Sequence, residues 1–245
     1  MRLSRWVERT FKKNFLPILE KFMRRPLKHS AMLNFNSLKR ILVIRAHDHL
    51  ADYLLSTPTL RALREHFPEA HLALLLRPHP GEVAQHCEFI NELIIFPESP
   101  GGWTLKGYRQ CRRQLRRGFD LAIVLNTVSH SLTSDLLAHF SRSKNVLGSA
   151  HLRFPRCSRN FFYDMIAPYW DVPKHQSDRN LDIVRHIGVD TKNRRSMMTL
   201  QAAELAAGKL NEAQAQLLFA WVPDSRVLST YLHHVTKDAN DALRG

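Results

Sequence analysis

The chain has 245 residues, 44% of them hydrophobic, and a formal net charge of +14 at pH 7. This is enough apolar material for one α/β domain with its core. The three cysteines are widely separated and odd in number, which excludes a disulfide framework and a zinc knuckle and fits a reducing cytoplasm. No run of about 18 apolar residues exists and no apolar signal-peptide core precedes the first elements, so we expect neither a transmembrane helix nor secretion.

Most of the positive charge lies at the start of the chain. Residues 1–40 hold 11 Lys and Arg against two Glu, with aromatic residues between them. A basic amphipathic helix of this kind is typical of proteins that bind an anionic membrane surface. Each basic side chain near the headgroups adds roughly 1 kcal/mol to the binding free energy. Alternatively the apolar side packs on the protein's own domain, and Pro17 divides the segment. No recognition motif favours nucleic acid as the partner. The predicted membrane-surface residues are Trp6, Phe11, Lys12, Lys13, Phe15, Phe22, Arg24 and Arg25.

The next segment predicts a strand, a polar loop and a helix. Residues 41–44 form an apolar run rich in β-branched side chains, typical of a parallel strand covered on both faces. Apolar residues then recur at helical spacing from residue 54 to residue 67, with Pro58 suiting a first turn or a kink. Asp52 lies between the two. Ligands of open α/β sheets bind just beyond the carboxyl ends of strands, so this segment is a candidate active site.

The strand-then-helix unit recurs along the chain. Further strands are predicted at residues 71–76, 92–96 and 120–125, with a short fifth at 146–147. Helices are predicted at residues 81–86, 105–117, 131–140 and 178–187, and Gly118 and Gly188 suit helix ends. The pattern predicts an α/β fold with a Rossmann-like parallel sheet at residues 39–190, preceded by a basic amphipathic extension at residues 1–38.

Four segments resemble the N-terminal half of glycosyltransferase family 9, the heptosyltransferase-like enzymes of lipopolysaccharide core assembly. The first pairs Leu50-Ala51-Asp52 with Ser56-Thr57-Pro58, where the family has an apolar residue, Gly, Asp and then Thr-Pro. The others are residues 60–70, residues 119–148 with their Phe-Asp-Leu-Ala-Ile-Val-Leu strand, and the His and Asn-Leu segment of residues 175–181. Their order and spacing along the chain match the family.

The resemblance implies the acceptor-side, N-terminal half of a GT-B fold. It also implies inverting transfer of a sugar from a nucleotide-sugar donor, such as ADP-heptose, to a lipopolysaccharide acceptor at the cytoplasmic face of the inner membrane. No cofactor and no metal is implied. A sugar hydroxyl needs a base to accept its proton as it attacks, and Asp52 matches the family's position for that base. The alternative for Asp52 is a helix N-cap.

Two features depart from the family pattern. Ala51 replaces the glycine before the aspartate, which narrows the backbone freedom of that turn. After Gly188 only 57 residues remain, too few for a second domain of typical size. Residues 191–245 are therefore predicted to be a remnant of the donor-binding domain, mostly helical or irregular, and the donor site is largely missing from this chain.

Polar residues beside the first and fourth strands are the candidate acceptor contacts. The residues expected to bind phosphate or sugar hydroxyl groups are Arg45, His47, His49, Asn126, Thr127 and Ser129. Turn formation is the alternative role for the last three. We expect the arginines at residues 112–117 to lie on a solvent-exposed helix face, where positive charge near the helix C-terminus interacts favourably with the helix dipole.

Two other functional classes remain open. A His-x-His pair, His47 and His49, at the end of a first strand occurs in metal-dependent hydrolases, although those barrels need eight βα units and further ligands. The chain could instead be a truncated, non-catalytic module that binds an acceptor or a membrane. The first strand-helix turn contains no glycine, which excludes a dinucleotide-binding fingerprint.

Overall fold

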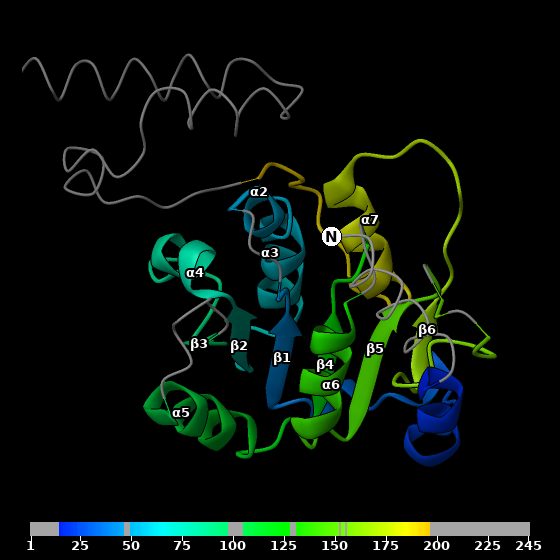
Figure 1. Ribbon diagram of the computed structural model, residues 1–245. Helices are drawn as coiled ribbons and strands as arrows, with labels where there is room; N and C mark the ends of the chain where they lie inside the picture. Colours follow the sequence, from blue (N-terminus) through cyan, green and yellow to red (C-terminus); the bar gives the residue numbers. More distant parts are fainter. Residues whose placement is uncertain are drawn as a thin grey trace, which may run out of the picture. The chain divides into compact units, whose positions relative to one another are not determined.

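The computed structural model describes residues 15–46, 50–97, 105–127, 131–151, 153–154 and 156–196. Six parallel strands form one sheet in the order β3-β2-β1-β4-β5-β6 (Figure 1). The strands are β1 (Arg40–Ile44), β2 (His71–Leu76), β3 (Glu92–Ile95), β4 (Leu121–Val124), β5 (Asn145–Ser149) and β6 (Met165–Ala167). This is the strand order of the doubly wound Rossmann fold, so the predicted fold class is confirmed.

Six α-helices that are described over their whole length connect and follow the strands. They are α2 (Leu50–Leu54), α3 (Thr57–His66), α4 (Pro78–Ala84), α5 (Leu105–Leu115), α6 (Leu132–Phe140) and α7 (Gln176–Arg185). Gly118 and Gly188 have positive φ angles of 75° and 84°, which confirms them as stops after α5 and α7. Short 3-10 turns at Ser30–Met32 and Phe35–Ser37 lead into β1.

The core forms because the central strands are apolar on both faces. Alternate residues of β1 point to opposite sides of the sheet. Leu42 and Ile44 belong to a cluster with Leu115 of α5 and Leu137 of α6, so these two helices cover one face. Figure 1 shows α6 crossing in front of β4 on this face. On α3 and α7, which contact one another, Leu60 and Leu181 are fully buried.

Two elements differ from the sequence-based prediction. The helix predicted from residue 54 begins only at Thr57, as α3, with Pro58 in its first turn. A separate short helix, α2, ends at Leu54, and the chain turns at Leu55 and Ser56 between the two. Pro58 therefore sits where its missing N–H costs nothing. Strand β6 was not predicted, since three residues between a Phe-Phe-Tyr run and Pro168 give no period to recognise.

The N-terminal segment, as far as it is described, packs on the α/β domain. Residues 15–23 are helical, and Leu16 is fully buried in the core cluster, with Leu19 and Met23 packed against it. Arg25, predicted at a membrane surface, instead donates to Asp164 through Nε at 2.9 Å and to two backbone carbonyls. Its role is structural, because a guanidinium held by a buried carboxylate does not face a membrane. Trp6, Phe11, Lys12 and Lys13 lie outside the described residues.

No helix within the described ranges has the length and apolarity needed to cross a bilayer. Residues 197–245, which include most of the predicted donor-domain remnant, lie outside the described residues. The predicted domain boundaries at residues 38 and 190 stay predictions.

Asp120, just before β4, ties the amino ends of three strands together. Its carboxylate accepts the backbone N–H groups of Lys39 and Arg40 at 2.9 and 3.0 Å, and the Lys144 ammonium at 2.7 Å. Burial acts to raise the pKa of Asp120, but the bonds from Lys144, Arg40 and Lys39 outweigh it and lower the pKa.

This lowered pKa predicts a pH-dependent contribution to stability. The folded protein binds the Asp120 proton less readily than the unfolded chain, so the stabilisation is present above about pH 4 and is lost as the pH falls through the folded-state pKa. We expect Asp120→Asn to lower the free energy of unfolding by about 1–2 kcal/mol at pH 7. Urea unfolding should show the difference shrinking towards pH 2.5. An equal difference at both pH values would contradict this account.

Candidate functional site

The sheet changes its winding direction between β1 and β4. From β1 the chain moves outward through β2 and β3, and from β4 it moves the other way through β5 and β6. In such sheets the crevice outside the carboxyl ends of the two central strands is where ligands bind. Arg45 directly follows β1, and Asn126 and Thr127 follow β4, so the strand pairing itself brings these residues together.

An ion pair between Arg45 and Asp52 lies at this position. Asp52 is the third residue of α2, and its Oδ1 lies 2.6 Å from Nη2 of Arg45. The Arg45 side chain is fully buried, while the Asp52 side chain keeps 14% of its surface exposed. The pair therefore joins a guanidinium inside the domain to a carboxylate that reaches the surface at the carboxyl edge of the sheet.

Backbone and hydroxyl oxygens complete the surroundings of Arg45. Its Nη1 donates to the carbonyl of Leu125 and, at 3.4 Å, to Oγ1 of Thr127, while Nε has no hydrogen-bond partner among the described residues. Burial lowers the pKa of the Arg45 guanidinium, and the neighbouring Asp52 carboxylate opposes this shift. A buried cation with a single carboxylate partner depends strongly on that partner.

The side-chain amides of buried Asn180 and half-buried Gln176 hold Thr127 in place. Oγ1 of Thr127 donates to Oδ1 of Asn180 at 2.7 Å and accepts from Nε2 of Gln176. Asn180 in turn donates to the carbonyl of Leu55, in the turn between α2 and α3, at 2.9 Å. Helix α7 is thereby connected to the segment that carries Asp52. One sequence signal pointed to this segment, namely the Asn-Leu pair within residues 175–181.

Asn126 belongs to a separate buried network behind the site. Its amide donates to Oδ1 of Asp135 at 3.2 Å and to the Tyr163 hydroxyl at 3.3 Å, and that hydroxyl donates to the same Asp135 oxygen. Full burial and the Asp135 carboxylate raise the pKa of Tyr163 well above its ordinary value. This network fixes β4, α6 and the segment before β6 around the end of β4.

The predicted acceptor contacts are placed differently from one another. The side chains of Arg45, Asn126 and Thr127 are buried and paired inside the domain, with residue exposures of 1, 3 and 4%. They support the site from within, in contrast to the direct contact with a sugar that the sequence suggested. His47, His49 and Ser129 lie outside the described residues.

Asp52 is the polar group that this arrangement presents. The N-cap interpretation is wrong, because Asp52 lies inside α2 and two residues of the helix precede it. Its Oδ1 is held by Arg45, whereas within the described part of the chain Oδ2 has no hydrogen-bond partner. A carboxylate fixed through one oxygen and free at the other can accept a proton from a hydroxyl group that enters the site.

No group of three or more His, Cys, Asp or Glu side chains among the described residues is arranged to hold a metal ion. The cysteines Cys87, Cys111 and Cys157 are all free and buried.

Comparisons with known proteins agree on the fold. No protein-family model and no curated protein matches the chain. A solved structure titled as glycosyltransferase family 9 from Veillonella parvula DSM 2008 is 19% identical with a TM-score of 0.52, and the match covers 71% of this chain and 51% of that one. The E. coli heptosyltransferase WaaC with ADP-2-deoxy-2-fluoro heptose is 13% identical with a TM-score of 0.50, covering 71% of this chain and 56% of that one.

The chain thus spans about half the length of the solved structures that it matches. The family resemblance that the sequence suggested is confirmed at the level of the fold. Identities of 13 and 19% establish nothing finer than this.

A double-mutant cycle tests the Arg45–Asp52 pair. Arg45→Met leaves the carboxylate without its counter-ion, and Asp52→Leu leaves a buried guanidinium unpaired, so each should lower the free energy of unfolding by about 3 kcal/mol. The double variant Arg45→Met/Asp52→Leu removes both charges and should lose at least about 1 kcal/mol less than the sum of the two. Urea unfolding measures all three, and strictly additive losses would contradict a coupled pair.

Proposed function

We propose that this chain is the acceptor-side half of an inverting glycosyltransferase that uses a nucleotide-sugar donor. The observation that carries the proposal is Oδ2 of Asp52 at the β1–β4 switch point, which has no hydrogen-bond partner among the described residues, on a fold shared with glycosyltransferase family 9. The likeness to an E. coli heptosyltransferase bound to an ADP-heptose analogue supports ADP-heptose as the donor to test first. A lipopolysaccharide core sugar is the matching acceptor.

Asp52 acts in this proposal as the general base. The acceptor hydroxyl donates its proton to Oδ2 while its oxygen forms a bond to the anomeric carbon of the donor sugar. The bond from that carbon to the nucleotide diphosphate breaks, and the diphosphate leaves from the opposite face, so the configuration inverts. The proton ends on Asp52, and the electron pair of the broken bond leaves with the diphosphate.

Arg45 is a positioning residue for this step. Its guanidinium holds Oδ1 at 2.6 Å and so fixes the direction in which Oδ2 points. Full burial keeps Arg45 away from a ligand, and its bonds to the Leu125 carbonyl and to Thr127 fix the guanidinium in turn. The carboxylate therefore needs no rearrangement when a hydroxyl group arrives, which is the advantage of a preorganised site.

The donor half is proposed to come from outside the described domain. The leaving diphosphate needs compensating positive charge from basic side chains or helix N-termini. The matched glycosyltransferases are about twice as long as the part that this chain covers. A donor-binding half, on the same polypeptide or on another, would complete the site, with residues 39–190 as the acceptor-side domain.

The described domain by itself supports a second candidate function. An acceptor-side domain can act as a non-catalytic module that binds a phosphorylated glycan acceptor. It would bind the acceptor with the same affinity whether or not a donor-binding half is present, and would turn over no donor. An assay of transfer from ADP-heptose, with a donor-binding half supplied, separates the two functions, because only the enzyme turns over the donor.

We also infer that the helix of residues 15–23 contacts a membrane surface with its outer side. One side packs on the domain through Leu16, whereas Ile18 and Phe22 are 53 and 82% exposed. Exposed Lys21 and Arg24 flank these apolar side chains, as in helices that lie at a lipid interface. The packing on the protein's own domain concerns the inner side of this helix, and the proposed membrane contact concerns its outer side.

Substitution of Asp52 tests the proposed base. With the donor-binding half of a family 9 enzyme supplied, we expect Asp52→Asn to reduce kcat for transfer from ADP-heptose by about 10²–10⁴ with little change in KM, because the amide cannot accept the proton. The control is Thr191→Ser, which keeps the hydroxyl that accepts from the backbone N–H of Asn193 after α7.

Asp52→Asn also leaves Arg45 without its charge partner and is expected to lower the stability of the fold. The assay therefore runs below the thermal unfolding midpoint of the variant, which circular dichroism measures. A folded variant that keeps wild-type kcat would remove Asp52 from the role of base. Acceptor binding without any transfer by the wild-type pair of halves would favour the non-catalytic module.

The outer side of the helix of residues 15–23 can be tested without disturbing the core. Ile18→Ser/Phe22→Ser removes two exposed apolar side chains and should weaken binding to vesicles of 70% phosphatidylcholine and 30% phosphatidylglycerol at least about tenfold. Trp170→Ser/Val172→Ser removes exposed apolar surface elsewhere and should leave binding unchanged. Cosedimentation measures both, and unchanged binding of the first variant would contradict the inference.

A further inference from the structure

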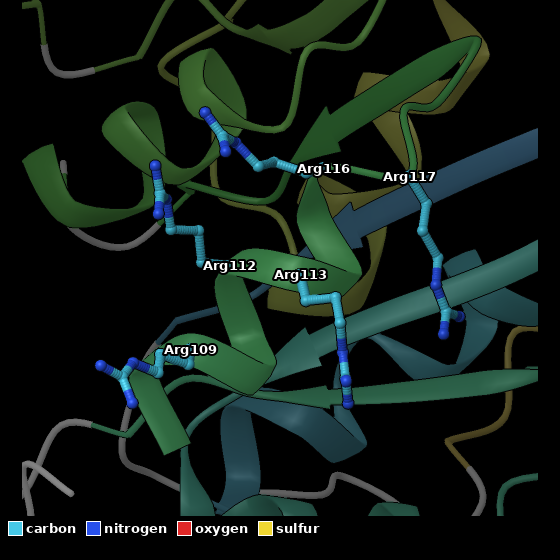
Figure 2. A pocket seen from close by; sticks show the side chains of 5 residues that line it. All are labelled: Arg109, Arg112, Arg113, Arg116 and Arg117. Atoms are coloured by element: carbon cyan, nitrogen blue, oxygen red, sulfur yellow. The ribbon is translucent and has the colours of Figure 1, made fainter. Parts of the chain in front are cut away.

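Helix α5 and the turn after it carry an unusual concentration of arginine. Residues 105–117 contain six Lys and Arg and no acidic residue. Figure 2 shows five of these side chains extending from α5 and its turn. They border an open hollow of about 310 Å³, and they are Arg109, Arg112, Arg113, Arg116 and Arg117. We call these five residues the arginine surface.

Little within the described part of the chain neutralises this surface. The Arg117 guanidinium pairs with Glu92 at 3.1 Å. The side chains of Arg109, Arg112, Arg113 and Arg116 are exposed and have no hydrogen-bond or ion-pair partner among the described residues. Like charges three and four residues apart on a helix repel one another. The helix is held in spite of this by its inner side, where Cys111 and Leu115 enter the core. A negatively charged partner would relieve the repulsion.

At the start of α5, the exposed side of the helix is apolar. Leu105 and Tyr108 keep 63 and 45% of their surface exposed. With Arg109, Arg112 and Arg116 they follow the spacing of one helical face. Side chains that can enter the acyl boundary thus adjoin side chains that can bind headgroup phosphates, which is the composition of an interfacial helix.

This surface is separate from the candidate active site. Arg117 binds Glu92, the first residue of β3, so the end of the arginine surface lies at the amino edge of the sheet. Asp52 lies beyond the carboxyl end of β1, at the opposite edge of the parallel sheet. A ligand on the arginine surface therefore leaves the proton-accepting oxygen free.

We propose that the arginine surface of α5 binds the anionic headgroups of a membrane. Guanidinium groups bind phosphate through paired hydrogen bonds, and a cluster of four to eight basic residues on an amphipathic helix suits an anionic leaflet. The exposed Leu105 and Tyr108 favour a lipid surface over a soluble phosphorylated sugar or a nucleic acid, because only the lipid offers an apolar layer beneath its phosphates. The contact is independent of sugar transfer and of residues 15–23.

Three exposed arginines without partners provide the test. Binding of the full chain to vesicles of 70% phosphatidylcholine and 30% phosphatidylglycerol is compared for the wild type and for Arg109→Gln/Arg112→Gln/Arg116→Gln. We expect the triple Gln variant to bind at least about tenfold more weakly at 0.1 M salt, since each charge near the headgroups contributes. The corresponding triple Lys variant, which keeps the charge, should retain most of the binding.

A matched control removes the same charge elsewhere. Lys39→Gln/Arg142→Gln/Lys192→Gln changes three exposed basic residues on other segments and should alter vesicle binding less than about twofold. The proposal is overturned if the triple Gln variant binds vesicles like the wild type, or if the control loses as much. It is also overturned if the wild type binds soluble inositol hexakisphosphate through these arginines but does not bind the vesicles. Thermal unfolding of each variant confirms that α5 is still folded.

Discussion

The buried pair of Arg45 and Asp52 is the interaction on which the carboxyl edge of this sheet depends. A guanidinium with no exposed surface needs a carboxylate, and Asp52 is the carboxylate that it has. The carbonyl of Leu125, Thr127 and, through Thr127, Asn180 then connect the ends of β1 and β4 to α7. The pair thus couples the topology of the sheet to the position of one carboxylate oxygen.

Different regions of the domain are suited to different partners. The switch point presents a single fixed carboxylate, which suits proton transfer more than the binding of an anion. The basic surfaces lie elsewhere: α5 reaches the amino end of β3 through Arg117, and the segment that follows residues 15–23 contacts the start of β5 through Lys28 and Asn145. In Figure 1 both segments lie towards the amino ends of the strands, away from α2. The proposed membrane contact through these surfaces would leave the edge of Asp52 open to the proposed substrates.

Local patterns predicted what local physics determines. The apolar run of β1, the strand at His71–Leu76 and the glycine stops at Gly118 and Gly188 were recognisable because each signal lies within a few residues. The burial of Arg45 and Thr127 was not, since it depends on Asn180, 53 residues beyond Thr127. Arg25 is the clearest case: its partner Asp164 lies 139 residues away, and nothing near Arg25 distinguishes it from a solvated arginine.

The geometry of a reacting complex tests the central claim most directly. A crystal structure of the chain with a supplied donor-binding half, an acceptor sugar and an unreactive nucleotide-sugar analogue would show which protein atom faces the nucleophilic hydroxyl. We expect that hydroxyl oxygen to lie about 2.6–3.2 Å from Oδ2 of Asp52, with Oδ1 still held by Arg45. An acceptor bound at another edge of the sheet, or an Asp52 with both oxygens turned to Arg45, would contradict the account.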